Sequence, residues 1–457
     1  MSGVRPPRRD WGLAMLSRRM LAVGVSATLA VAGVLAVPNP AGAAPAGAST
    51  AAAIAALRTE LVSAARTGGV GNGASADAAI SGSGRYAAFV SHATNLVAGD
   101  TNRRVDIFVR DLSNGTTRRA SLGAGGVQAN GPSGQPAVSA NGRFVAFASQ
   151  ATNLVAGDTN GQPEVFVRDM VAGTTRRVSV GAGGAQANGD SAAPAISSTG
   201  RFIAFVSSAS NLVAGDTNGQ SDLFLRDTTA GTTTRLSVGP GGAQSNGYAD
   251  GPSISADGRY VTFASPATTL VPGDTNGQVD VFLRDRVART TTRISVGPGG
   301  AQSNGATSQA VISADGRQVA FVSEASNLAP TDTDAEPDVL IRNLATGVNT
   351  QVSFRNDDLI GSFASEPDVS GDGRFVAFIT PSPQVPGVPE GNVEVYVRDV
   401  VAGTARLVSV ANNGAPANLP NSSPAISDAG GRVAFQSAAT NLTAGDANGQ
   451  DDIFVRR

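Results

Sequence analysis

Short runs of alternating apolar and polar residues recur along most of the chain, each bounded by Gly, Asn, Asp or Ser. One group consists of RFIAFVS at 201–207, DLFLRD at 222–227 and TTTRLSVG at 232–239. Alternation with a period of two residues is typical of β-strands that bury one face. The pattern therefore predicts an all-β chain of short antiparallel strands joined by turns.

These runs belong to a repeat that is marked by a Gly-Arg pair. The glycine of the pair lies at 84, 142, 200, 258, 316, 373 and 431, at successive steps of 58, 58, 58, 58, 57 and 58 residues. Each copy holds up to four runs, which we name strands a, b, c and d, and strand a of the third copy is PAIS at 194–197. Four antiparallel strands repeated at a fixed period indicate a β-propeller blade, so the sequence predicts a seven-bladed β-propeller.

The last copy ends after strand c, at IFVRR, so its fourth strand must come from elsewhere. The segment LVSA at 61–64 fits this role, because 17 residues separate Ser63 from Ile80, as they separate Ser179 from Ile196. We therefore predict that an N-terminal strand completes the last blade and closes the ring, which hides the sheet edges. The propeller is predicted to span residues 58–457, after a linker at 44–57 that is disordered or a short helix.

Some copies carry a recognisable motif across the a–b turn and strand b. They read SADGRYVTFAS (255–265), SADGRQVAFVS (313–323) and SGDGRFVAFIT (370–380), and strands such as DVFLRD follow. These motifs resemble the repeats of TolB-like β-propellers, a WD-repeat-like group of the exported bacterial type. The resemblance covers about residues 58–457. It implies the propeller fold, but for function it implies several roles, among them protein-binding scaffolds and domains attached to peptidases.

The first 43 residues have the pattern of a signal peptide. Arginines precede an apolar stretch from Met20 to Val37, and small residues follow at 41–43. We expect cleavage after Ala43; a retained anchor is the alternative, since the apolar stretch is nearly long enough to span a bilayer. Ser17-Arg18-Arg19 partly matches a twin-arginine signal, so the Sec and twin-arginine routes both stay open. The mature chain is then secreted or lies in the cell envelope or periplasm, without a membrane span.

Composition excludes several function classes. Removal of residues 1–43 takes the net charge from −2 to about −6, which gives no electrostatic footprint for nucleic acid. The chain has no Cys, and its single Trp lies at position 11, so neither a disulfide framework nor a mature tryptophan platform for sugars is available. His92 is the only histidine and has no evident partner for a catalytic triad. We assign no catalytic residue and expect a monomer.

The residues that recur in every copy are predicted to be structural. The arginines that begin strand b and those near the end of strand c should pair with Asp side chains or carbonyl groups at the blade edge. The aspartates that end strand c should hold the c–d hairpins by accepting backbone N–H groups. These are Asp111, Asp169, Asp227, Asp285 and Asp399.

Function is expected on the rim that carries the b–c and d–a links, because these links are long and alternating strand direction places both on one face. We predict a noncatalytic propeller that binds a protein or a cell-envelope component there; packing of the links against each other is the simpler alternative. Copies five and six depart most from the repeat, in TDTDAEPD (331–338), RNDDLIGSF (355–363) and PSPQVPGVPEGN (381–392). The predicted partner-binding residues are Asp332, Asp334, Glu336, Asp338, Asp357, Asp358 and Glu390. The competing hypothesis is a hydrolase or lyase that uses carboxylates in the central channel.

The b–c links have a second interpretation as weak calcium sites. Asp216, Asn218 and Asp222 stand at positions 1, 3 and 7 of the segment DTNGQSD (216–222). Such an alternation of oxygen ligands suits Ca²⁺. The equivalent residues are Asp100, Asn102 and Asp106; Asp158, Asn160 and Glu164; Asp274, Asn276 and Asp280; and Asp446, Asn448 and Asp452. A polar turn explains the same spacing, with Asp216 accepting the N–H groups of Asn218 and Gly219. We favour the turn, because the bidentate Glu of an EF-hand has no counterpart here, and we expect no other cofactor.

Overall fold

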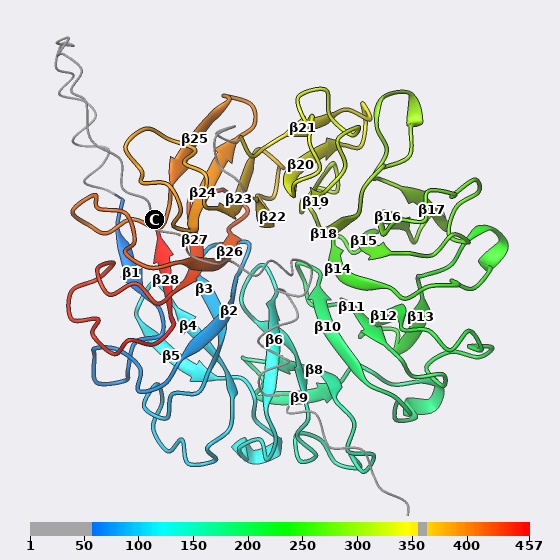
Figure 1. Ribbon diagram of the computed structural model, residues 1–457. Coiled ribbons are helices and arrows are strands. Elements are labelled where there is room, and N and C mark those ends of the chain that lie inside the picture. The colour runs from blue at the N-terminus through cyan, green and yellow to red at the C-terminus, as the bar shows by residue number, and fades with distance from the viewer. Residues whose placement is uncertain (1–56, 355–362) are drawn as a thin grey trace, which may run out of the picture.

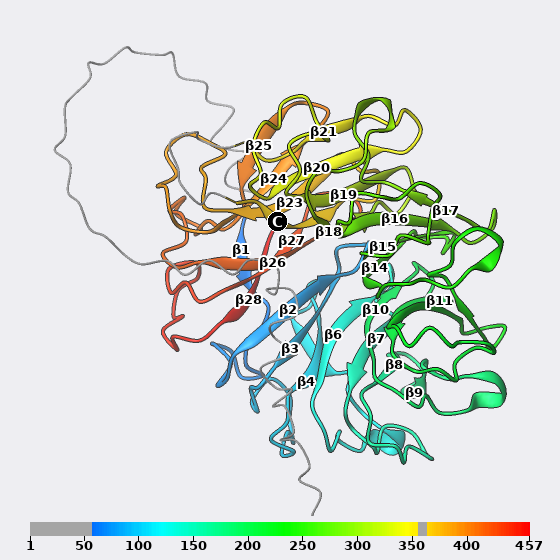
Figure 2. The same cartoon turned by 45° about the vertical axis from the view of Figure 1, so that its right-hand side comes forward.

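The computed structural model describes residues 57–354 and 363–457, which form a ring of seven four-stranded antiparallel sheets. Figure 1 shows the first strands of the blades around the centre and the later strands towards the outside, and Figure 2 shows the same arrangement turned by 45°. The predicted fold is therefore confirmed. The predicted signal peptide and residues 44–56 of the predicted linker lie outside the described residues. Within the described ranges, no helix has the length and apolar character needed to cross a membrane.

The strands of the first four blades follow in chain order from the centre outward. Blade one has β2 (Ser75–Ile80), β3 (Tyr86–Ser91), β4 (Asp106–Asp111) and β5 (Thr116–Arg119). Blade two has β6 (Ser133–Val138), β7 (Phe144–Ser149), β8 (Glu164–Asp169) and β9 (Thr174–Arg177). Blade three has β10 (Ser191–Ile196), β11 (Phe202–Ser207), β12 (Asp222–Asp227) and β13 (Thr232–Arg235). Blade four has β14 (Asp250–Ile254), β15 (Tyr260–Ser265), β16 (Asp280–Asp285) and β17 (Thr290–Arg293).

The remaining blades repeat this order until the last, whose outer strand comes from the N-terminal side. Blade five has β18 (Thr307–Ile312), β19 (Gln318–Ser323), β20 (Asp338–Asn343) and β21 (Asn349–Gln351). Blade six has β22 (Ser365–Val369), β23 (Phe375–Thr380), β24 (Glu394–Asp399) and β25 (Thr404–Leu407). Blade seven has β26 (Asn421–Ile426), β27 (Val433–Ser437), β28 (Asp452–Arg456) and β1 (Thr59–Leu61). Short 3-10 helices lie in the d–a links after blades one to four: η1 (Ala124–Gly126), η2 (Ala182–Gly184), η3 (Pro240–Gly242) and η4 (Pro298–Gly300).

The ring closes as predicted, through antiparallel pairing of β1 with β28. The strand starts two residues before the predicted LVSA segment, and Leu61 pairs with Phe454. Beyond β1, Val62 N donates to the carbonyl oxygen of Ile453 at 2.7 Å, and Ser63 Oγ donates to Asp452 at 2.5 Å. Strands from the two ends of the described chain thus share one sheet.

The apolar core lies between neighbouring blades. One buried cluster joins Val165 and Val178 of blade two to Ile203, Phe205 and Phe224 of blade three. Phe205 and Phe224 stack across strands b and c, with ring centroids 5.9 Å apart. Burial of each such side chain contributes about 1.5–3 kcal/mol, so the Val, Ile, Leu and Phe of strands b and c stabilise the ring.

The face of the ring opposite the long b–c and d–a links carries the short a–b turns. Main-chain hydrogen bonds join these turns around the ring. Ser83 N donates to Ala140 O at 3.0 Å, and Ala140 N donates to Ser198 O at 3.1 Å. The chain of bonds closes where Asp428 N donates to Gly82 O at 3.0 Å. This face is therefore a belt of tight turns.

The predicted structural role of the strand arginines and aspartates is confirmed. Arg201 Nη2 lies 2.8 Å from Asp227 Oδ2, and Asp227 Oδ1 accepts the N–H groups of Thr229 and Ala230 at 3.0 Å. The hydrogen bonds from Arg201 lower the pKa of Asp227 to about 2. In strand c, Arg168 Nη1 donates to Leu122 O of the preceding blade at 3.1 Å. The same Arg–Asp pair occurs as Arg85–Asp111, Arg143–Asp169, Arg259–Asp285 and Arg374–Asp399.

Candidate functional site

The two kinds of long link meet on one face, as the strand directions predicted. Asn188, in the d–a link before blade three, donates through Nδ2 to Ser210 Oγ at 2.9 Å, and its Oδ1 accepts from Ser210 N at 2.8 Å. The same exchange joins Asn130 with Thr152, Asn246 with Thr268, and Asn418 with Thr440. The d–a links before blades two, three, four and seven are thus each fixed to the b–c link of the blade that follows.

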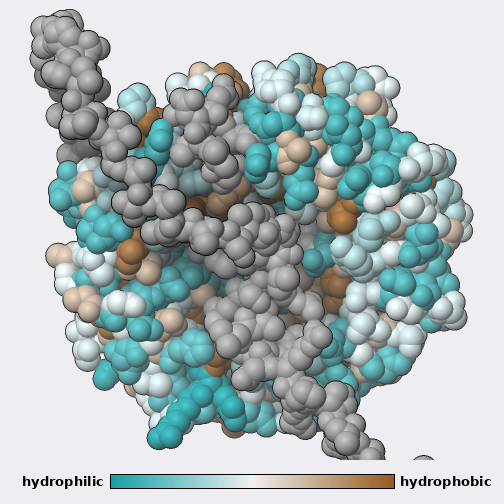
Figure 3. All heavy atoms as spheres, in the orientation of Figure 1, coloured by the Kyte–Doolittle hydropathy of each residue, from teal (hydrophilic) through white to brown (hydrophobic). Residues whose placement is uncertain are grey.

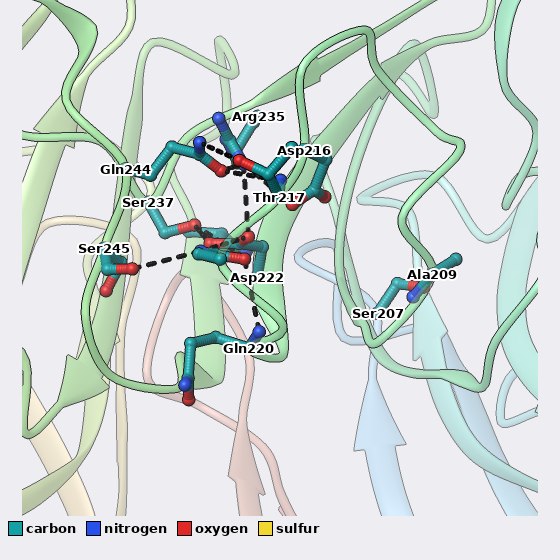
Figure 4. Close-up of polar contacts among 12 residues, drawn as sticks. Ser207, Ala209, Asp216, Thr217, Gln220, Asp222, Arg235, Ser237, Gln244 and Ser245 are labelled. Carbon is teal, nitrogen blue, oxygen red and sulfur yellow. Dashed lines mark hydrogen bonds and ion pairs between the residues drawn. The ribbon is translucent and has the colours of Figure 1, made fainter.

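A glutamine of the d–a link also fixes the b–c link of its own blade. In blade three, Gln244 Oε1 accepts from Thr217 N at 3.0 Å and from Arg235 Nη1 at 2.7 Å (Figure 4). Gln244 Nε2 donates to Thr217 Oγ1 at 2.9 Å. This one side chain therefore connects two loops and the end of strand d.

The predicted metal ligands of blade three form an ion pair with the arginine at the end of β13. Arg235 Nη1 lies 3.0 Å from Asp216 Oδ1 and 3.4 Å from Asp222 Oδ2 (Figure 4). Ser237 Oγ and Asn218 Nδ2 donate to Asp222 at 2.5 and 2.9 Å. Burial raises the pKa of Asp216, and the nearby Asp222 raises it further.

The turn itself differs in detail from the prediction. Asn218 rather than Asp216 holds it, because Asn218 Oδ1 accepts from Gln220 N at 3.2 Å. Asp216 is turned towards the guanidinium of Arg235 instead. The Asp216 carboxylate gains more from the full positive charge of a guanidinium than from a neutral backbone N–H group, which explains the preference.

The same arrangement recurs in blades one, two and four, with arginines at the position of Arg235. The ion pairs are Arg119 with Asp100 and Asp106, Arg177 with Asp158 and Glu164, and Arg293 with Asp274 and Asp280. Asn102, Asn160 and Asn276 donate to the last carboxylate of each set. In these four blades the guanidinium occupies the position that a cation would need, and the calcium interpretation stays a prediction.

Blade seven has the same carboxylates with an apolar residue at the position of the arginine. In blade three Arg235 of strand d pairs with Phe224 of strand c, and in blade seven Leu61 pairs with Phe454 at the same position. Asn448 Nδ2 donates to Asp452 Oδ2 at 2.8 Å. Burial, together with the Asp452 carboxylate, raises the pKa of Asp446 to about 6.

Blade five brings three carboxylates together. One oxygen each from Asp332, Asp334 and Asp338 lies within 4.8 Å of the others. Asp334 stands where the links of blades one to four and seven have Asn, and Gln351 stands at the position of Arg235, donating to Asp338 Oδ2 at 3.1 Å. Such an oxygen-rich set could hold a divalent cation. The sequence assigned these residues to partner binding rather than to metal, and the paired changes at 334 and 351 are the signal that would have revealed the set.

The predicted partner-binding residues lie on the long-loop face of blades five and six, apart from Asp357 and Asp358, which are outside the described residues. Asp334, Glu336 and Glu390 are exposed, whereas Asp332 and Asp338 are buried. The role of these residues in partner binding stays a prediction.

Blade six differs from the other blades in its b–c link. Pro383, Val385, Pro386 and Val388 line a surface hollow of about 370 Å³, together with Gln384, Gly387 and Glu390. Exposed large hydrophobic side chains elsewhere are scattered over the described surface, and the face in Figure 3 shows small hydrophobic areas between hydrophilic ones. The hollow is therefore shallow, and its lining mixes Pro and Val with the polar side chains of Gln384 and Glu390.

Glu394, which begins β24, is buried beneath this link. Ser409 Oγ, Asn392 Nδ2 and Asn421 Nδ2 donate to its carboxylate. The position of Arg235 is taken by Leu407, and burial raises the pKa of Glu394 to about 7. Glu394 is thus a buried acid with neutral hydrogen-bond partners among the contacts described.

Acidic residues of the inner strand β22 bind main-chain groups of the next blade. Glu366 Oε2 accepts from Ser423 N at 2.5 Å, and Asp368 Oδ2 accepts from Ile426 N at 2.7 Å. His92, the only histidine, is exposed at the start of the first b–c link. The described contacts of these three residues are those of structural or surface groups.

Comparison with known proteins supports the fold. No family model and no curated protein matches the chain. Among solved structures, oligogalacturonate lyase in complex with manganese is 12% identical, with a TM-score of 0.50 and coverage of 88% of this chain and 90% of that chain. Acylaminoacyl peptidase is also 12% identical, with a TM-score of 0.50. The match covers 84% of this chain and 51% of that chain.

TolB from Acinetobacter baumannii is 17% identical, with a TM-score of 0.40. The match covers 71% of this chain and 64% of that chain. TolB is therefore among the solved structures to which this chain is similar, while the propeller fold itself is shown by the seven four-stranded sheets. At these identities, likeness between structures says nothing about activity.

Proposed function

We propose that the protein is an exported, noncatalytic binding propeller that holds a protein or a cell-envelope component on its long-loop face, over blades five and six. The proposal is supported chiefly by the contrast between a repeated, rigid rim in blades one to four and altered links in blades five and six. A rigid scaffold with a few altered loops is the usual arrangement of a binding surface.

The repeated part of the rim provides the rigidity. Arg235 and Gln244 tie the b–c link of blade three to strand d and to the d–a link, and the same residue types do so in blade four. Side chains committed to such a network are poorly placed to contact a partner as well. The altered links carry exposed carboxylates in blade five and the proline-rich hollow in blade six.

An extracytoplasmic location follows from the predicted signal peptide, and a chain without cysteine suits an oxidising compartment without depending on it. Under this proposal the partner is an envelope or secreted component of the producing cell.

The test is capture of partners from the envelope fraction of that cell by the mature protein and by a link-replacement variant. In the variant, residues 381–392 are replaced by the corresponding residues of blade three, 208–220, so that Val393 keeps the position of Ser221 before strand c. The control exchanges the links of blades three and four, residues 208–221 and 266–279, which have the same length. We expect the blade-six replacement to abolish specific capture and the control to retain it. Capture by the replacement variant equal to that of the control would refute the assignment to this region.

The competing hydrolase or lyase hypothesis makes a different prediction. Carboxylates of the innermost strands, among them Asp77, Asp250, Glu366 and Asp368, would act on substrate, although Glu366 and Asp368 accept hydrogen bonds from the next blade. Turnover of a glycan or ester substrate by the mature protein, lost in Glu366→Gln and retained in the blade-six replacement, would favour the enzyme.

A further inference from the structure

We infer that blade seven binds a phosphate group through Arg58, Arg432 and Arg457 on the short-turn face, which is the face of the ring that carries the a–b turns. This inference does not rest on the proposed function, which concerns the opposite, long-loop face. The two faces can therefore be tested separately.

The three arginines form a row across three neighbouring strands. The antiparallel register of β27 and β28 places Arg432 and Arg457, the residues just outside these strands, opposite each other. On the other side of β28, Arg457 N donates to the carbonyl oxygen of Arg58 at 3.0 Å, directly before β1. Residues opposite each other in such strands have Cβ atoms about 4.5–5.5 Å apart, and like charges there are destabilising. An anion beside the row would relieve this repulsion.

The row is a departure of blade seven from the repeat. At the same three positions blade three has Phe202, Asp227 and Thr232. An aromatic residue, Asp and Thr also stand there in blades one, two, four and six. In blade three Arg201 pairs with Asp227, whereas blade seven has Gly431 at the position of Arg201. Blade seven has therefore exchanged a neutral ion pair for a row of positive charges.

Contacts with blade one hold two of the guanidinium groups close together. Arg432 Nη1 donates to Gly84 O at 2.5 Å, and Arg457 Nη2 donates to Leu112 O at 2.9 Å. These two acceptors are neighbours, because Leu112 N donates at 2.8 Å to the carbonyl oxygen of the residue that follows Gly84. The two guanidinium groups therefore converge at the junction of blades seven and one.

The arginines keep hydrogen-bond donors for a ligand. A guanidinium group carries five N–H donors. Arg58 is exposed, and its side chain has no partner among the contacts of the described residues. Within the same contacts Arg432 uses only Nη1, and the side chain of Arg457 is 35% exposed. The row is thus accessible from solvent.

The acidic groups near the row only partly offset its charge. They are Glu60, Asp428 in the a–b turn of blade seven, and the carboxylate of the final residue. Glu60 is bound by Arg457, whose Nη2 lies 2.8 Å from Glu60 Oε2. Arg110 of blade one adds a positive charge, which interacts with Glu60. This end of blade seven is therefore positive, in a chain that is negative overall.

Phosphate suits this row better than a carboxylate does. Guanidinium groups pair bidentately with both anions. A phosphate group has more oxygen atoms than a carboxylate, and they can accept hydrogen bonds from several guanidinium groups at once. Free phosphate and the headgroups of anionic phospholipids share this chemistry, and the experiment distinguishes these two sources.

The first arm of the test is calorimetric titration of the mature protein with inorganic phosphate, and with acetate and chloride at equal ionic strength. We expect phosphate to bind with a dissociation constant of about 1–10 mM, at least about fivefold more tightly than acetate. Phosphate should also raise the melting temperature more than chloride does, because it bridges the closing strand and its neighbours. Equal effects of phosphate and chloride would overturn the inference.

The second arm locates the binding with substitutions taken from the repeat. Arg432→Phe and Arg58→Thr introduce the residues of blade three at these positions, so both variants should fold, and melting curves verify this. Each should weaken phosphate binding about fivefold or more. Arg143→Thr is the control, because it removes the same charge from the same face at a side chain that is 47% exposed and paired with Asp169. An equal loss in this control would refute the site.

The third arm identifies the source of the phosphate group by sedimentation with vesicles. One set consists of phosphatidylcholine, and the other contains about 30% phosphatidylglycerol. Binding to the second set alone, lost in Arg432→Phe, would support the site and identify lipid headgroups as its ligand. Phosphate binding without vesicle binding would support the site for a soluble phosphate compound. Absence of both would overturn the inference.

Discussion

The ring of Phe144 in blade two lies against the α-carbon of Gly200 in blade three, so closely that a Cβ on Gly200 would stand 2.4 Å from Phe144 Cδ2. Gly200 also has a φ of +77°, which side chains other than hydrogen rarely allow. The first residue of strand b packs on the next blade's glycine in the same way at Tyr86–Gly142, Phe202–Gly258, Tyr260–Gly316 and Phe375–Gly430. The glycine of the Gly-Arg pair is therefore an inter-blade contact as well as a turn residue in these blades, except in blade seven, where Gly430 takes this place directly before the pair Gly431-Arg432.

Gly200→Ala should destabilise the protein by about 2–5 kcal/mol, through overpacking against Phe144 and backbone strain. The matched control is Gly219→Ala, because Gly219 has a φ of +67° with no atom within 4 Å of the added Cβ. The control should cost only the strain, about 1–2 kcal/mol. Denaturant unfolding of the two variants measures the difference, and equal costs would show that the Phe144 contact has no energetic role.

The glycine repeat explains why the fold was predictable, since its spacing fixes the number of blades. The inner strands were harder to predict. In β10 the pairing with β11 shifts between Ala192 and Ala195, and Ala193 has a φ of +51° directly before Pro194. A proline argues against a regular strand, and a left-handed alanine is uncommon, so local propensity gives no reason to expect this bulge. Contacts between blades impose it: Ala193 N donates to Gln135 of blade two at 2.8 Å.

The candidate site was predictable only in part, for a similar reason. The spacing of Asp216, Asn218 and Asp222 suggested a turn or a cation site within one loop. Arg235, which contacts two of these carboxylates, lies on another strand, and its reach depends on the pairing of Phe224 with Arg235. That contact is set by sheet register rather than by local spacing.

The closing strand should be essential for stability. Deletion of residues 44–66 removes β1 and the fully buried Val62, and leaves an open edge on β28. We expect aggregation or a loss of several kcal/mol. Deletion of residues 44–56 keeps β1 and serves as the control. Equal melting temperatures and sedimentation profiles for the two truncations would contradict the closure.

Arg235→Gln copies the residue found in blade five and should destabilise blade three by about 3–5 kcal/mol, because Asp216 and Asp222 would be left as buried charges without their cation. Arg201→Gln is the control: its side chain is 49% exposed, so loss of its pair with Asp227 should cost about 1 kcal/mol or less. Chemical denaturation gives both values, and an equal cost would show that burial of the rim pair is unimportant.

Calcium should not stabilise the links of blades one to four, because their arginines lie against the carboxylates that calcium would need. The measurement is the melting temperature of chelator-treated protein with and without millimolar Ca²⁺. A rise that disappears in Asp216→Ala would show that calcium displaces Arg235. A rise that survives this substitution would direct attention to another set of carboxylates.

Glu394 should make the protein less stable as the pH rises towards neutrality. Burial raises its folded pKa to about 7 from an ordinary value of 4.5, so the folded state retains a proton that the unfolded state has released. The contribution of Glu394 to stability is therefore complete below about pH 4.5 and is lost as the pH rises through about 7. A shift of this size corresponds to roughly 3 kcal/mol.

Glu394→Gln should remove this component, so that the free energy of unfolding falls less steeply between pH 5 and 8 than in the parent protein. Some slope should remain, because burial also raises the pKa of Glu164 to about 7. Glu390→Gln, an exposed change in the same link, is the control and should leave the profile unaltered. Urea unfolding at several pH values provides the comparison. Parallel profiles for Glu394→Gln and the parent protein would mean that Glu394 is ionised at little cost, with its three hydrogen-bond donors compensating for burial.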